Sequence, residues 1–145
     1  MKQIQIVLIC LGLILASRSI GNTPTISQQD WGSVDGTPVY LYTLANAQGV
    51  VVKITNYGGI ITEFHVPDRD GKMDNIVLGL NGLDAYLKGH PALGCIVGRY
   101  TNRIGNAQFT LDGVEYQLAK NSNGQHNIHG GRKNFYTKVW NGTTL

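Results

Sequence analysis

The chain has 145 residues, enough for one domain or part of one. Twelve Lys and Arg stand against nine Asp and Glu, a formal net charge of +3. Lys2 and Arg18 fall in an N-terminal leader, so ten basic residues remain against nine acidic ones, and a net charge of +1 indicates no nucleic-acid partner.

Residues 1–20 have the three-part pattern of a secretory signal peptide. Lys2 gives a positive start, Ile4 to Ala16 is largely apolar, and small and polar residues follow from Ser17. The apolar run is shorter than the roughly 20 residues that span a bilayer, although an uncleaved anchor is the alternative. We expect a mature chain of residues 21–145 that is secreted or lumenal in the secretory pathway and has no membrane association after cleavage.

Cleavage would also remove Cys10 and leave Cys95 as the single cysteine, so no internal disulfide framework is expected. Cys95 lies in an apolar run, which favours a buried, unreactive thiol. Asn141-Gly142-Thr143 is a glycosylation sequon, and a secretory protein could use it.

Beyond the leader, the first elements predicted are strands. Val39 to Leu44 alternates between two faces, and a turn at Ala45 to Gly49 leads to a second strand, Val50 to Asn56, that forms a hairpin with the first. Gly58-Gly59 ends this strand, and Ile60 to Val66 is a third.

In the middle of the chain the predicted elements are short and separated by turns. Pro67 to Gly71 is turn-rich, Ile76 to Leu78 is predicted as a short apolar strand, and Leu83 to Leu87 is the only convincing helix. Leu93 to Val97 is predicted as a buried strand or extended segment.

Asp112-Gly113 is the best two-residue hairpin signal in the chain. It joins Ala107 to Leu111 with Val114 to Leu118, so that Phe109 and Leu111 can face Tyr116 and Leu118 across the hairpin. Strands separated by turns in this way predict an all-β, antiparallel sandwich or barrel. Lys138 to Trp140 resembles the start of another strand with no later strand to pair with, so we expect a truncated sandwich.

Two segments carry groups that can bind hydroxyls. Gly98 to Gly105 holds Arg99, Asn102 and Arg103, which offer planar guanidinium donors and an amide that both donates and accepts. The alternative is that these side chains tie a long loop to backbone carbonyls.

Asn121 to Gly131 contains His126 and His129. The segment is too rich in Asn and Gly for a helix, and no cysteine or carboxylate stands nearby, so we predict no metal site and no cofactor. His129 precedes Gly130-Gly131, where a ligand can approach closely, and its imidazole can bind a hydroxyl or move a proton near neutral pH.

These segments and others resemble the N-terminal part of the aldose 1-epimerase, or galactose mutarotase, family. The resemblance runs from about Asp30 to Trp140 and rests on five segments in family order. They are Asn56-Tyr57-Gly58-Gly59, Val77-Leu78-Gly79, Gly98 to Ile104, Phe109 to Gly113 with Tyr116 and Leu118, and Ile128-His129-Gly130-Gly131.

The resemblance implies a large β-sandwich that interconverts the α and β anomers of aldohexoses such as glucose and galactose. It implies that Asn102 and Arg103 contact the sugar and that His129 is the first of two active-site histidines. The second histidine, an aspartate and the glutamate base of the family would lie farther along than Leu145. Thr101, His126 and Ile128 depart from the usual family residues alanine, asparagine and leucine.

Ring opening needs a base at the anomeric hydroxyl and an acid at the ring oxygen. The chain has only two glutamates, and neither Glu63 nor Glu115 is placed by its strand as a persuasive base. Two hypotheses follow: an incomplete mutarotase that is inactive alone, or a secreted, non-catalytic carbohydrate-binding protein. A third alternative is a chain that does not fold, because half a sandwich exposes open sheet edges and an uncovered apolar face.

Overall fold

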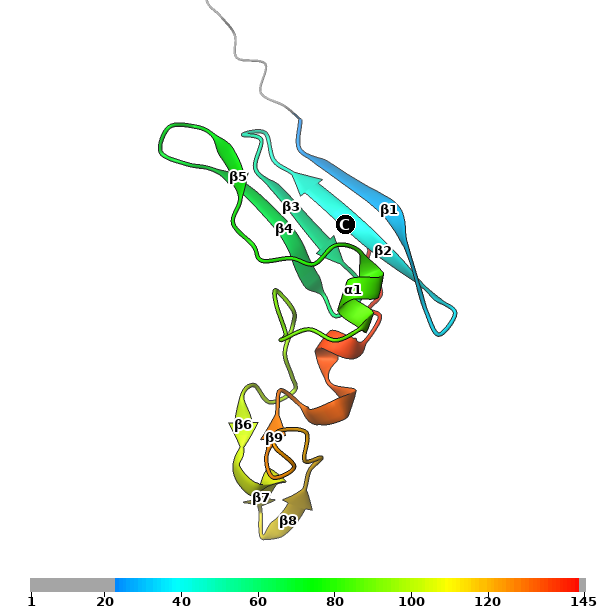
Figure 1. Cartoon of the computed structure of the whole chain (residues 1–145), viewed down its shortest axis with the longest axis vertical. Helices are drawn as coiled ribbons and strands as arrows, with labels where there is room; N and C mark the ends of the chain where they lie inside the picture. The colour runs from blue at the N-terminus through cyan, green and yellow to red at the C-terminus, as the bar shows by residue number, and fades with distance from the viewer. Residues whose placement is uncertain (1–22, 144–145) are drawn as a thin grey trace, which may run out of the picture.

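The computed structural model describes residues 23–143, and the predicted leader lies outside them. Strands β1 to β5 form one antiparallel sheet in chain order, and two small antiparallel sheets pair β6 with β9 and β7 with β8 (Figure 1). The predicted all-β antiparallel fold is confirmed. The elements are β1 (Thr25–Val34), β2 (Thr37–Ala45), β3 (Val51–Thr55), β4 (Ile60–Pro67), β5 (Met73–Asn75), α1 (Leu83–Leu87), β6 (Arg103–Ile104), β7 (Gln108–Leu111), β8 (Val114–Gln117) and β9 (Asn127–Ile128), with 3₁₀ turns at Gly105–Ala107, Gly131–Lys133 and Phe135–Thr137.

One face of the five-stranded sheet carries the main core. Alternation along β2 places Val39 and Leu41 on this face. Ile60 of β4 is fully buried beside them, and α1 covers the patch with Leu83 and Tyr86 (Figure 1). Because the helix has only five residues, its stability comes from this packing rather than from helix propensity.

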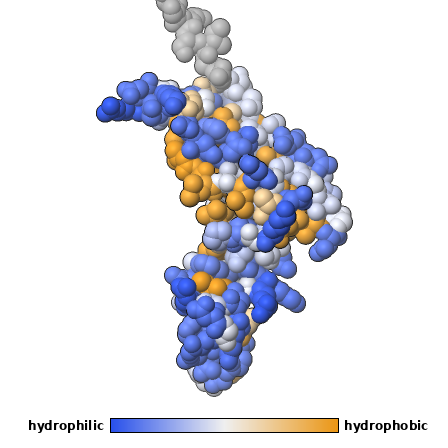
Figure 2. All heavy atoms as spheres, viewed as in Figure 1, coloured by the Kyte–Doolittle hydropathy of each residue, from blue (hydrophilic) through white to orange (hydrophobic). Residues whose placement is uncertain are grey.

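The opposite face is also apolar but only half-buried. Its side chains follow from the register, which pairs Tyr42 with Ile54, Leu44 with Val52, and Val52 with Phe64. On the other side of the sheet, the side that α1 covers, some apolar residues also show at the surface (Figure 2).

Three expectations for the strands need correction. Ile76 to Leu78 is not a strand, because the Asn75 side chain accepts hydrogen bonds from the Phe64 and Val77 backbones and ends the ladder. Ile76 and Leu78 are consequently 63% and 78% exposed. Strand β1, which the sequence did not indicate, is polar and mostly exposed because it lies at the sheet edge.

The third correction concerns the last segment. Val139 forms a bridge with Tyr57, so residues 138–140 do have a partner earlier in the chain. Leu93 to Val97, expected as a buried strand or extended segment, begins instead with a turn at Leu93 and Gly94, where Gly94 has φ of 62°. Residues 95–97 belong to no strand, and Ile96 is 50% exposed. Cys95 is half-buried, and burial raises the pKa of its thiol, which keeps it protonated and unreactive.

A smaller lobe holds β6 to β9 below the sheet in Figure 1. The predicted hairpin is confirmed, and Phe109 stacks on Tyr116 with ring centroids 5.1 Å apart. The expected facing of Leu111 and Leu118 is wrong, because Leu111 pairs with Val114 next to the turn and Leu118 lies beyond the end of β8. Within residues 23–143 no helix is long and apolar enough to cross a membrane.

His90 lies between aromatic rings of α1 and of the turn at Phe135–Thr137. Its ring centroid is 5.2 Å from that of Tyr86 and 5.6 Å from that of Tyr136. Its Nδ1 is buried with no hydrogen-bond partner in residues 23–143. Burial lowers the pKa of His90 below its ordinary 6.5, so the folded chain holds this ring neutral.

We therefore predict that acid weakens the fold through His90. The unfolded chain binds the proton more readily, so the free energy of unfolding is complete above about pH 6.5 and falls as the pH drops below it. Thermal unfolding of the wild type should show a lower Tm at pH 5.5 than at pH 8. His90→Phe keeps the ring but not the proton site and should flatten this dependence; equal slopes in both proteins would contradict the assignment.

Candidate functional site

The predicted site residues flank the two-residue ladder of β6 and β9. Arg103 pairs with Ile128, which places Asn102 and His129 opposite each other at one end. The His129 backbone N–H donates to the Asn102 carbonyl at 3.0 Å, and the Asn102 backbone N–H donates to His129 Nδ1 at 3.1 Å. Residues 27 positions apart are thus joined by two reciprocal hydrogen bonds.

These bonds fix which nitrogen of His129 can face a ligand. A backbone N–H can only donate, so Nδ1 is the acceptor, and the neutral ring carries its proton on Nε2. Nε2 has no hydrogen-bond partner among the described residues. His129 therefore presents a free N–H donor from a half-buried ring.

Arg103 stands beside this pair. Its Nη1 donates to Asn102 Oδ1 at 3.4 Å, and both side chains are exposed. The structure thus brings together Asn102, Arg103 and His129. Their groups can donate several hydrogen bonds, which suits an oxygen-rich ligand.

Some polar side chains do tie loops to the backbone, which was the alternative to a ligand-binding role, but they are asparagines other than Asn102. The Asn121 side chain exchanges two bonds of 2.9 Å with the Ile128 backbone, as a strand neighbour would. Buried Asn127 donates to Ala119 O at 2.8 Å, and Asn134 donates to Gly131 O at 2.7 Å. The arginines form no such backbone bond in residues 23–143, so this scaffolding leaves their donors available.

The backbone at the site is held in unusual conformations. Asn102 and His129 have φ of 62° and 53°, in the left-handed region that few residues other than glycine adopt. Gly130 has φ of 85°, and a Cβ there would overlap the Gly98 carbonyl oxygen. Such strain persists only where surrounding contacts hold it, and it clusters at functional sites.

His126, which departs from the family pattern, has a structural contact. Its Nδ1 accepts a bond of 3.0 Å from the Asn106 backbone N–H, and the Gln125 side chain donates to Asn106 Oδ1. This holds Asn106 at φ 54°, within the turn that follows β6. His126 thus supports the position of β6, and among the described residues it forms no hydrogen bond with Asn102 or His129.

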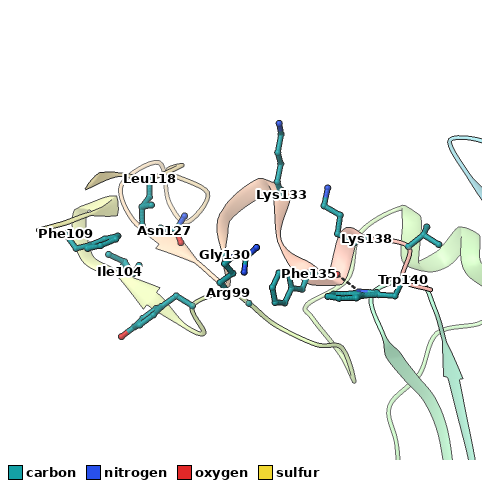
Figure 3. A pocket seen from close by; sticks show the side chains of 13 residues that line it. Arg99, Ile104, Phe109, Leu118, Asn127, Gly130, Lys133, Phe135, Lys138 and Trp140 are labelled. Carbon is teal, nitrogen blue, oxygen red and sulfur yellow. Dashed lines mark hydrogen bonds between the residues drawn. The ribbon is translucent and has the colours of Figure 1, made fainter. Parts of the chain in front are cut away.

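A cavity of about 730 Å³ lies next to these residues but is lined by others (Figure 3). Arg99 and Gly130 line it, while their neighbours Asn102, Arg103 and His129 do not. The guanidinium carbon of Arg99 is 5.6 Å from the centre of the Phe135 ring, and the Trp140 indole N–H donates to Phe135 O at 3.2 Å.

The charge around the cavity is positive. Its lining includes Arg99, Lys133 and Lys138 and no carboxylate. The sequence had indicated Arg99 as a hydroxyl-binding group in the segment Gly98 to Gly105, whereas no sequence signal indicated the aromatic residues at 135 and 140.

Neither glutamate adjoins the site. Glu115 is exposed on β8, where it accepts a bond from Gln117. Glu63 lies on the sheet between His65 and Lys53, at 2.7 Å and 2.9 Å. Hydrogen bonds from His65 and then Lys53 lower the pKa of Glu63, which makes its carboxylate a weaker base.

This chain is similar to proteins described as aldose 1-epimerases or galactose mutarotases. The sequence profile of the family described as aldose 1-epimerase matches residues 40–145. Galactose mutarotase of Bos taurus is 46% identical over 89 residues, which cover 61% of this chain and 26% of that protein. A probable aldose 1-epimerase of Arthroderma benhamiae is 38% identical over 113 residues, covering 74% of this chain and 26% of that one.

The fold is similar to solved structures with the same description. A galactose 1-epimerase from Lactobacillus acidophilus superposes with a TM-score of 0.69 at 29% identity, covering 81% of this chain and 33% of that one. The chain thus spans about a quarter to a third of the length of these relatives.

We predict that Gly130 is essential to the join between the two site segments. Gly130→Ala places an alanine in the left-handed region and makes its Cβ overlap the Gly98 carbonyl. Gly124→Ala also places an alanine in the left-handed region, with φ of 65°, but its Cβ would meet no other atom. Urea unfolding should show a loss of about 1–2 kcal/mol for Gly124→Ala and about 1–3 kcal/mol more for Gly130→Ala. Equal losses in the two variants would show that the close approach to Gly98 carries no energy.

Proposed function

Because the chain belongs to the aldose 1-epimerase family, we propose that it supplies the sugar-binding part of an enzyme that interconverts hexose anomers. The observation that carries this proposal is the reciprocal pairing of Asn102 and His129 beside Arg103. This pairing holds the exposed or half-exposed side chains of Asn102, Arg103 and His129 side by side, so that they form one set of hydrogen-bond donors on a fixed backbone.

Each group has a role that follows from its geometry. The Nε2–H of His129 donates to the sugar ring oxygen, where negative charge develops as the ring opens. The Arg103 guanidinium and the Asn102 amide bind neighbouring hydroxyls and orient the ring. A small neutral sugar is therefore the ligand, and the family membership supports this choice.

The reaction also needs a base at the anomeric hydroxyl, and we place that base outside these 145 residues. Two observations support this: the cavity lining contains no carboxylate, and the bonds to Glu63 lower the pKa of its carboxyl. On this proposal the chain binds sugar and is inactive alone. We also propose that it enters the secretory pathway, on the pattern of residues 1–20.

A second candidate function is a secreted carbohydrate-binding protein without turnover. The same observation favours it, because the hydrogen-bond donors are assembled next to a cavity whose lining contains no carboxylate to remove a proton. The two candidates differ in whether the donors act in catalysis when a base is supplied.

We predict that the purified chain does not accelerate mutarotation. Polarimetry on freshly dissolved α-D-glucose should give the rate of buffer alone, because proton transfer at the anomeric hydroxyl has no partner. A rate clearly above buffer would place the base within the 145 residues, and Glu63→Gln and Glu115→Gln would then identify it.

We further predict that the segment functions once a base is supplied. Replacing the matching segment of bovine galactose mutarotase with that of this chain should give an active chimera. The exchanged segment is taken to include residues 40–145 of this chain, so that it carries Arg103 and His129. His129→Ala should then lower kcat at least about tenfold, as expected for loss of a positioned acid–base or hydrogen-bonding group, and Arg103→Ala should mainly raise KM.

Arg132→Ala is the matched control, since Arg132 is exposed and does not line the cavity. It should leave both constants unchanged. A folded chimera, judged by circular dichroism, that has no activity would favour the binding protein; an active chimera indifferent to His129→Ala would remove His129 from the mechanism.

A further inference from the structure

The sequon at Asn141 is not used by the proposed sugar site. Asn141-Gly142-Thr143 is the one Asn-X-Ser/Thr triplet in the 145 residues. It follows the bridge between Val139 and Tyr57 and lies outside helix and strand. All three residues are exposed, so a transferase and a bulky glycan can reach them.

The residue before the sequon is firmly anchored. The Trp140 backbone N–H donates to Asn56 O at 2.8 Å, and the Asn56 side chain donates to Trp140 O at 3.1 Å. The Trp140 indole donates to Phe135 O at 3.2 Å. Asn141 is therefore held at one place on the sheet, on the half-buried apolar face.

Two tyrosines lie beside the sequon on that face. Gly142 packs against the Tyr42 ring, and a pocket of about 460 Å³ is lined by Tyr40, Tyr42, Asn141 and Thr143 among others. Tyrosine rings at a surface present an apolar body and a polar tip, which suits the mixed surface of a pyranose. Both rings are only partly buried by the protein.

We propose that Asn141 carries an N-linked glycan whose first sugars cover Tyr40 and Tyr42. The proposal rests on entry into the secretory pathway. In the reaction, Asn141 Nδ2 attacks the anomeric carbon of an oligosaccharide held as a lipid pyrophosphate ester. The new N–C bond replaces the C–O bond to pyrophosphate, the amide loses one proton, and the lipid pyrophosphate leaves.

The full chain expressed in secreting animal cells tests the site. The protein should run as a larger species that PNGase F converts to the unmodified size in one step, with Asn141 changed to aspartate in its peptide mass. Asn141→Gln and Thr143→Ala should each abolish the larger species, while Thr143→Ser should keep it.

Asn81→Gln is the matched control, because Asn81-Gly82 is an exposed Asn-Gly pair followed by Leu83. It should leave the glycan in place. A second preparation carries a proven leader in place of residues 1–20. No shift in that preparation overturns the acceptor site; a shift there but not with the native leader overturns the secretory entry on which the proposal rests. Neither result affects the test of the proposed function, which uses the chimera with bovine galactose mutarotase.

Tyrosine nitration tests what the glycan covers. Glycosylated protein should lose nitration at Tyr40 and Tyr42 relative to Thr143→Ala, whereas Tyr100, which is 63% exposed and lies shortly before β6, should be nitrated equally in both. Equal nitration at Tyr40 and Tyr42 in the two proteins overturns the covering role.

Discussion

The candidate site depends on the pairing between Asn102 and His129. Three backbone groups and one ring nitrogen hold together two segments that contain almost no regular structure, since β6 and β9 have only two residues each. A neutral hydrogen bond adds only about 1 kcal/mol in water. The pairing therefore needs support, which comes from Gly130 against Gly98, from the Asn121 side chain on Ile128, and from His126 on Asn106.

This support explains why one region holds so many asparagines and glycines. A loop with little hydrophobic core must satisfy its backbone polar groups with side chains, and short amides do so at low entropic expense. Asn121, Asn127 and Asn134 are used in this way. The described arginines form no such bonds to backbone groups. Whether a side chain bonds to the backbone therefore distinguishes scaffold residues from ligand-binding residues more clearly than the residue type does.

Much of the fold could be predicted because period-two alternation and turn residues act locally. The strands around Val39, Val51 and Ile60 and the hairpin at Asp112-Gly113 followed from such signals. Strand β1 could not be predicted, because an edge strand is held by ladder hydrogen bonds to β2 and its polar side chains show no alternation. The strand expected at Ile76 failed for the opposite reason: the apolar run is present, but the Asn75 side chain occupies the backbone donors beside it.

The site was less accessible to local reasoning. Asn102, Arg103 and His129 were named from family order, whereas their contact depends on a positive φ at two residues other than glycine, which composition does not reveal. The neighbouring cavity depends on Phe135 and Trp140, and these are placed by the bridge from Val139 to Tyr57. That same bridge sets Asn141 on the open apolar face of the sheet. The bridge between Tyr57 and Val139 therefore positions both the cavity wall beside the candidate site and the proposed glycan. A substitution that breaks this bridge would disturb the cavity wall and the glycan together.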